Sequence, residues 1–107
     1  MLDWFFGMGI LFKVHRSYRW VVAVCDEDLV GRKLKDGVQQ IDLTSDFFRG
    51  EKLEGDELRE SVVDCLREDA TFNVVGAESV DFFKELNIID DSGIGKIDGV
   101  PFALVLL

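Results

Sequence analysis

The 107-residue sequence contains very little proline, cysteine or histidine. Its single proline excludes collagen-like and polyproline material. The two cysteines, Cys25 and Cys65, are too few for a disulfide framework and have no CxxC spacing. Both stand among apolar neighbours, where a reduced thiol behaves as a small buried hydrophobic group. We therefore expect a reducing, cytoplasmic location.

The sequence also lacks the short motifs that carry catalysis or bind cofactors. No GxSxG motif is present, and the cysteines, the histidine and the acidic residues show no metal-ligand spacing. The glycines of 93–99 match neither GxGxxG nor GxxxxGK[ST], so we expect no phosphate-binding loop. We therefore predict no catalytic residues, no metal and no cofactor, and a protein without enzymatic activity is favoured.

A cysteine–histidine pair would have to use His15, the one histidine of the chain. Residues 8–16 and 19–25 are two β-branched and aromatic runs, a pattern that predicts a hairpin turning at residues 17–18. In that register His15 lies opposite Trp20 and Cys25 opposite Ile10, about 17 Å apart along the strands. Hydrogen-bond reach is about 3 Å, so catalysis by Cys25 and His15 is excluded.

The content of apolar residues, 48%, is typical of a folded domain at this length. We expect a single globular domain over residues 8–107, preceded by an apolar N-terminal extension over residues 1–7. This extension has no basic region before it and no small-residue cleavage site after it, so no signal peptide is predicted. Its apolar run is too short to span a membrane, and no membrane partner is expected.

Apolar spacing predicts both helices and further strands. A helix is expected over residues 56–70, and a second one starts near 73–76, with Asn73 as its cap, and ends at 86. Further strands are expected over 38–43, 88–89 and 101–107. Because strands are grouped before helices, the predicted fold class is α+β, with a mixed or mainly antiparallel four- to five-stranded sheet covered by two or three helices.

The charge balance disfavours general nucleic-acid binding. Twelve Lys and Arg against 21 Asp and Glu give a net charge of −9, which repels phosphate backbones at long range. One hairpin is basic although the chain as a whole is acidic. Its basic residues alternate with Tyr18 and Trp20, and such a combination binds RNA through phosphate contacts and base stacking. Ordinary solubilising charge is the alternative interpretation. The basic candidates for binding are Lys13, Arg16, Arg19, Arg32 and Lys33.

Four segments in order resemble the archaeal domain of unknown function 424 family. They cover residues 22–31, 47–51, 70–80 and 99–101. The resemblance implies an archaeal cytosolic protein, and it assigns no activity that can be carried over to these residues. The family pattern has a histidine after the proline of the last segment, where this chain has Phe102.

Two hypotheses for the function follow. The first is a non-enzymatic binding or adaptor module linked to archaeal RNA or translation machinery, with a protein or RNA partner. In this hypothesis the protein is a homodimer held by the aromatic residues 4–6. The alternative is a small enzyme or metabolite-binding protein with a cleft near Cys25, Asp26 and Asn73.

Overall fold

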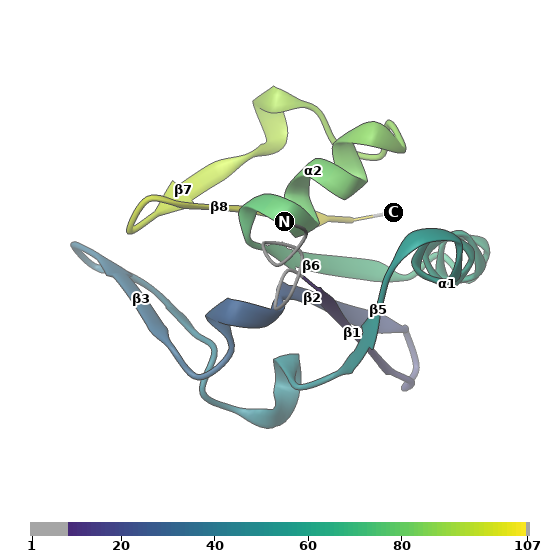
Figure 1. The fold of residues 1–107 in the computed structure, drawn as a ribbon, viewed down its shortest axis with the longest axis horizontal. Helices are drawn as coiled ribbons and strands as arrows, with labels where there is room; N and C mark the ends of the chain where they lie inside the picture. Colours follow the sequence, from purple (N-terminus) through teal and green to yellow (C-terminus); the bar gives the residue numbers. More distant parts are fainter. Residues whose placement is uncertain (1–8, 107) are drawn as a thin grey trace, which may run out of the picture.

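The computed structural model describes residues 9–106, which form eight strands and two α-helices (Figure 1). The strands are β1 (Ile10–His15), β2 (Val21–Asp26), β3 (Lys33–Asp36), β4 (Gln39–Asp42), β5 (Glu51–Leu53), β6 (Thr71–Val75), β7 (Gly95–Ile97) and β8 (Val100–Val105). The helices are α1 (Gly55–Arg67) and α2 (Ala77–Glu85), and the short 3-10 helices are η2 (Glu27–Leu29), η3 (Asp46–Phe48) and η4 (Asp91–Gly93). No helix within this part of the chain is long and apolar enough to cross a membrane.

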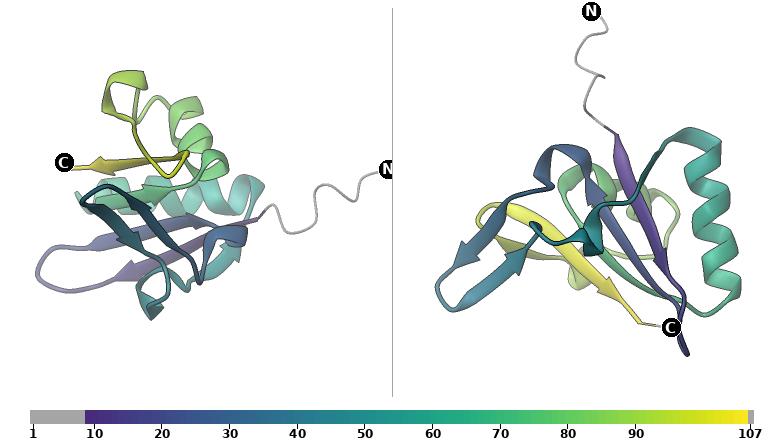
Figure 2. Two further views of the ribbon diagram at one scale, coloured as in Figure 1. Left: turned by 90° about the vertical axis from the view of Figure 1, so that its left-hand side faces the viewer. Right: turned by 90° about the horizontal axis from the view of Figure 1, so that it is seen from below.

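Six strands form one sheet in the order β5-β1-β2-β6-β8-β7. Its neighbouring strands are antiparallel except for β2 and β6, which are parallel. A parallel pair needs a long crossover connection, and α1 lies in the connection between β2 and β6. Strands β3 and β4 form a separate antiparallel hairpin that projects away from α1 (Figures 1 and 2). The predicted α+β class and the mixed, mainly antiparallel sheet are therefore confirmed.

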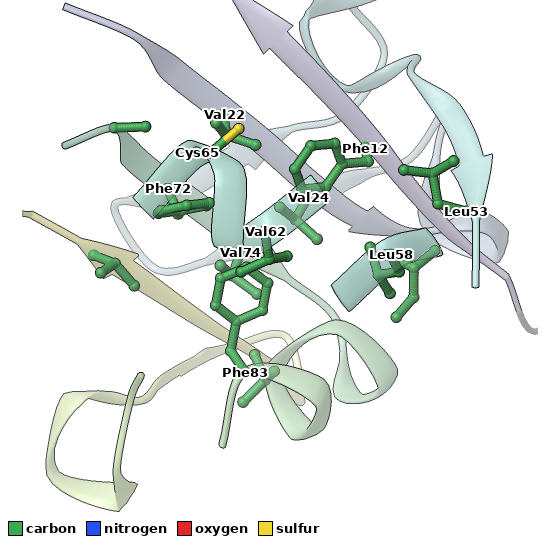
Figure 3. Close-up of a cluster of buried hydrophobic side chains, with 14 residues drawn as sticks. Phe12, Val22, Val24, Leu53, Leu58, Val62, Cys65, Phe72, Val74 and Phe83 are labelled. Atoms are coloured by element: carbon green, nitrogen blue, oxygen red, sulfur yellow. The ribbon is translucent and has the colours of Figure 1, made fainter. Parts of the chain in front are cut away.

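The larger core cluster lies between the two helices and one face of the sheet (Figure 3). Leu58, Val62 and Cys65 of α1 are buried there, because their spacing of three and four places them on one side of the helix. Val22 and Val24 of β2 face them and have no exposed surface. Burying each such apolar side chain stabilises the fold by roughly 1.5–3 kcal/mol.

The second core cluster lies on the opposite face of the sheet. Ala23 and Cys25 alternate with the valines of β2, so their side chains point to this other face, where Leu34 and Leu43 pack. The β3–β4 hairpin, the segment after it and η3 supply most of this cover. The face is less completely covered near the end of the chain, where Leu104 is 55% exposed.

The sheet is larger than the four to five strands predicted, because neither β5 nor β6 was expected. Asn73 was predicted to cap a helix, but it lies inside β6, and α2 begins only at Ala77. A short apolar run such as Val74 and Val75 is compatible with a strand or with a buried helical turn, and here pairing with β2 and β8 makes it a strand. Residues 88–89 form no strand.

The predicted register of the first hairpin is wrong by one residue. Leu11 lies opposite Cys25 and His15 opposite Val21, because the connecting loop takes residues 16–20 and not a two-residue turn. His15 and Cys25 are still about 14 Å apart along the strands, so they do not pair. The predicted extension over residues 1–7, with its dimer contact, lies outside the described residues.

Candidate functional site

A groove of about 800 Å³ lies between α1 and the β1–β5 edge of the sheet. We call it the α1–β1 groove. Phe12 and Val14 of β1 and Leu53 of β5 line one side, while Ser61 and Cys65 of α1 line the other. Charged side chains surround this apolar floor: Lys13, Arg16, Arg49, Arg67, Glu51, Asp64 and Glu68. The groove is therefore slightly cationic in a chain whose net charge is −9.

The cations of the groove differ in how they are neutralised. Arg67 pairs with Asp64 at 3.3 Å on the surface of α1, and Arg49 lies 3.7 Å from Asp46. The Lys13 ammonium donates a 2.7 Å hydrogen bond to the main-chain carbonyl of Asp46. Within the part of the chain that the structure describes, Lys13 therefore has no acidic side chain that compensates its charge. The Arg67–Asp64 and Arg49–Asp46 pairs are both exposed to solvent and therefore weak.

Arg16, like Lys13, is not neutralised by an acidic side chain of the described residues. Its guanidinium carbon lies 4.7 Å from the ring centroid of Trp20, and it makes no ion pair within residues 9–106. A guanidinium over an indole face is held by the ring quadrupole while its N–H groups stay able to donate. The residue therefore presents an oriented, uncompensated donor at the rim of the α1–β1 groove.

The structure brings together some of the predicted basic residues and separates others. Lys13 and Arg16 line the groove, and Arg19 is exposed in the same loop, 16–20. Arg32 and Lys33 follow the far end of β2, whereas this loop precedes its start, so the length of the strand separates the two groups. They do not form one basic face.

Sequence reasoning missed two cations of the groove, Arg49 and Arg67. Both are more than 30 residues from Arg16 in the chain, and only the packing of β5 and α1 beside β1 brings them near it. The position of Arg67 on the polar side of the predicted helix was visible in the sequence, but which element that side faces was not.

Asp26 caps α2 from the face of the sheet that the two helices cover. The main-chain N–H groups of Glu78 and Ser79 donate to its carboxylate at 3.0 and 2.8 Å, and the Ser79 hydroxyl donates at 2.7 Å. Asp26 thus caps α2 from a distant strand, satisfying amides that have no partner inside the helix. Burial raises the pKa of Asp26, and these three hydrogen bonds oppose the rise.

The structure does not bring Cys25, Asp26 and Asn73 together in one cleft. Asp26 points to the helix side of the sheet, whereas Cys25 and Asn73 lie on the opposite face. Cys25 has no exposed surface, and burial, reinforced by the nearby charges of Asp26 and Asp28, raises the pKa of its thiol to about 12. Such a thiol stays protonated and unreactive near neutral pH.

Asn73 lies instead in a second hollow, of about 350 Å³, on the hairpin side of the sheet. We call it the Asn73 cleft. Ile41 of β4, Phe47 of η3 and Phe102 of β8 are among its lining residues. Within residues 9–106, no three His, Cys, Asp or Glu side chains gather closely enough to hold a metal ion.

Residues 15–107 match the family described as Protein of unknown function (DUF424). The chain belongs to this family. A crystal structure of an uncharacterized conserved protein from Methanopyrus kandleri has the same fold, with a TM-score of 0.80, 24% sequence identity and 92% of each chain covered. No curated protein matches the sequence.

Of the four segments that resemble the DUF424 family, the second and the third contribute residues to the two hollows. The first includes most of β2 and all of η2, the second spans η3 and the start of β5, and the third contains β6 and the start of α2. Asp26 and Asn73 both fall in these segments. Phe102, which follows the proline of the last segment, lies in the Asn73 cleft.

Proposed function

We propose that this chain is a non-enzymatic binding module whose α1–β1 groove holds the backbone of a single-stranded RNA. The observation that carries the proposal is the uncompensated guanidinium of Arg16, fixed over Trp20 at the rim of a groove lined by three further cations. Proteins that bind single strands combine such a groove with aromatic side chains on which bases stack.

The β1–β2 loop supplies an aromatic side chain of the required kind. Tyr18, two residues from Arg16, is fully exposed. An exposed tyrosine ring beside arginines offers a base a stacking surface while the guanidinium groups contact phosphates. This arrangement supports RNA over an acidic peptide, because a peptide carboxylate gains nothing from the open ring of Tyr18.

The acidic remainder of the molecule limits how RNA can bind. With a net charge of −9, most of the surface repels a polyanion, so contact is restricted to the groove and the loop beside it. A module of this kind binds short, accessible single strands and does not bind along the length of a duplex. A place beside RNA or translation machinery is in keeping with this behaviour.

The test is fluorescence anisotropy with a labelled single-stranded RNA of about ten nucleotides. The Lys13→Ala/Arg16→Ala double variant is expected to bind at least about tenfold more weakly, since one hydrogen bond to a charged group contributes roughly 1.5 kcal/mol. Arg59→Ala is the matched control, because Arg59 is an exposed arginine of α1 outside the groove lining.

Two results would overturn the proposal. One is a loss of binding free energy in Arg59→Ala of half that of the double variant or more, which would show that only overall charge matters, because Arg59→Ala removes one positive charge and the double variant removes two. The other is binding of a labelled poly-glutamate peptide in place of the RNA, which would make the groove a docking site for acidic proteins.

A further inference from the structure

Asn73 is an unusual residue for its position. It stands in a strand with neighbours on both sides, opposite Ala23 of β2 and Leu104 of β8, where apolar and β-branched residues are favoured. Its side-chain amide makes no hydrogen bond within residues 9–106. Because the side chain is only half-buried, its amide stays accessible and is able to donate to and accept from a ligand in the cleft.

The surroundings of Asn73 are mainly apolar and aromatic. The Phe47 ring stacks on His15 with ring centroids 4.4 Å apart and packs edge-on against Phe48 at 5.0 Å, so it is held rigidly at the cleft. The Phe102 ring lies against Gly95, where a Cβ would come within 2.8 Å of it. Rigid aromatic walls with few polar groups are typical of small-ligand sites, and the volume falls in their usual range.

The charges at the cleft restrict the ligand further. Its lining includes one carboxylate, that of Asp42, and no cationic side chain. The Thr44 main-chain N–H and its hydroxyl both donate to this carboxylate, and these hydrogen bonds lower the pKa of Asp42. A ligand therefore places an uncharged ring in the cleft and keeps any phosphate outside.

We propose that the Asn73 cleft binds an adenine ring. A carboxamide presents one donor and one acceptor side by side, and adenine presents the complementary groups, the N7 acceptor and the N6 amino donor. The corresponding edge of guanine carries two acceptors, so the same amide pairs poorly with it. The inference rests on the cleft alone and does not depend on RNA binding in the α1–β1 groove.

Free adenosine and an adenine within a single strand share this chemistry, and both are used as probes. Isothermal titration calorimetry with adenosine, guanosine and uridine tests the free base, and titration with 5′-UUAUU-3′ against 5′-UUUUU-3′ tests the strand. We expect binding of adenosine, at least about tenfold weaker binding of guanosine, and weaker binding of AMP than of adenosine because of Asp42. Preference for UUAUU over adenosine would identify the strand as the source.

Asn73→Leu removes both hydrogen-bonding groups while keeping the same number of side-chain heavy atoms and the same branching, and we expect it to weaken adenosine binding at least about tenfold. Thr71→Val is the matched control, since Thr71 lies on the same strand and the same face but outside the cleft lining. Thermal unfolding of both variants shows whether they fold. Unchanged adenosine affinity in folded Asn73→Leu, or no adenosine binding by the native protein, would overturn the proposal, even if the groove binds RNA.

Discussion

The thiol of Cys25 lies under the β3–β4 hairpin with none of its surface exposed. Its Sγ donates to the main-chain carbonyl of Asp26 at 3.3 Å, a contact available only to the protonated thiol. Burial and two neighbouring carboxylates therefore act together and raise the pKa of Cys25 to about 12 from an ordinary value of 9.0. The residue contributes to packing, and its ionisation is coupled to folding.

This coupling predicts how stability depends on pH. Between pH 9 and pH 12 the unfolded thiol loses its proton while the folded thiol keeps it, so the unfolded state binds fewer protons and stability falls as pH rises. The free energy of unfolding should fall by about 1 kcal/mol per pH unit more in the native protein than in Cys25→Ala. Urea denaturation at pH 8, 9, 10 and 11 measures both slopes; parallel slopes would contradict the prediction.

At the scale of elements, the junction between β6 and α2 depends on a contact with β2. Gly76 adopts φ +112°, and a Cβ there would overlap the carboxylate of Asp26. The glycine thus permits two things at once: a backbone conformation that other residues rarely adopt, and the close approach that lets Asp26 cap α2. The sheet and the helix are fixed to each other at this point.

Gly76→Ala should therefore destabilise the protein by more than about 2 kcal/mol, because it adds backbone strain and displaces the cap. Gly93→Ala is the control: Gly93 has no positive φ, and a Cβ there meets nothing within 4 Å. Chemical denaturation of both variants measures the difference. A loss below about 0.5 kcal/mol in Gly76→Ala would show that the junction adapts at little cost.

An element could be predicted from the sequence where its own residues carry a periodic spacing of apolar side chains. The stripe of Leu58, Val62 and Cys65 identified α1 because its period is independent of other segments. Strand β6 has no such pattern, since both of its faces are partly buried and Asn73 interrupts the apolar run. Its strand conformation follows from pairing with β2 and β8, which are remote in sequence.

At the scale of the whole molecule, the candidate site was only half predictable. Lys13 and Arg16 were identified because they share one hairpin with Trp20. Arg49 and Arg67 join them only after β5 pairs with β1 and α1 packs on the sheet, so no local pattern links the four. The same tertiary packing places Asp26 and Asn73, both predicted as binding residues of one cleft, on opposite faces.

The charge of the whole molecule leads to the last prediction, which concerns salt. Single-stranded RNA releases about 0.7 counterions for each phosphate neutralised, so contact with about three phosphates gives a slope of roughly −2 for log affinity against log salt. The net charge of −9 opposes association at long range, but at 0.1 M salt that repulsion is screened beyond about 10 Å, so the groove contacts dominate the slope.

Removing Lys13 and Arg16 should make this slope shallower by roughly 1.4, because two phosphate contacts are lost, while Arg59→Ala should leave it unchanged. Anisotropy titrations of one RNA between 50 and 200 mM KCl, roughly the range over which such contacts lose most affinity, give the three slopes. If the double variant binds more weakly but keeps the slope of the native protein, its lost affinity comes from an altered loop and not from phosphate contacts. Lys13 and Arg16 would then shape the groove without touching the RNA backbone.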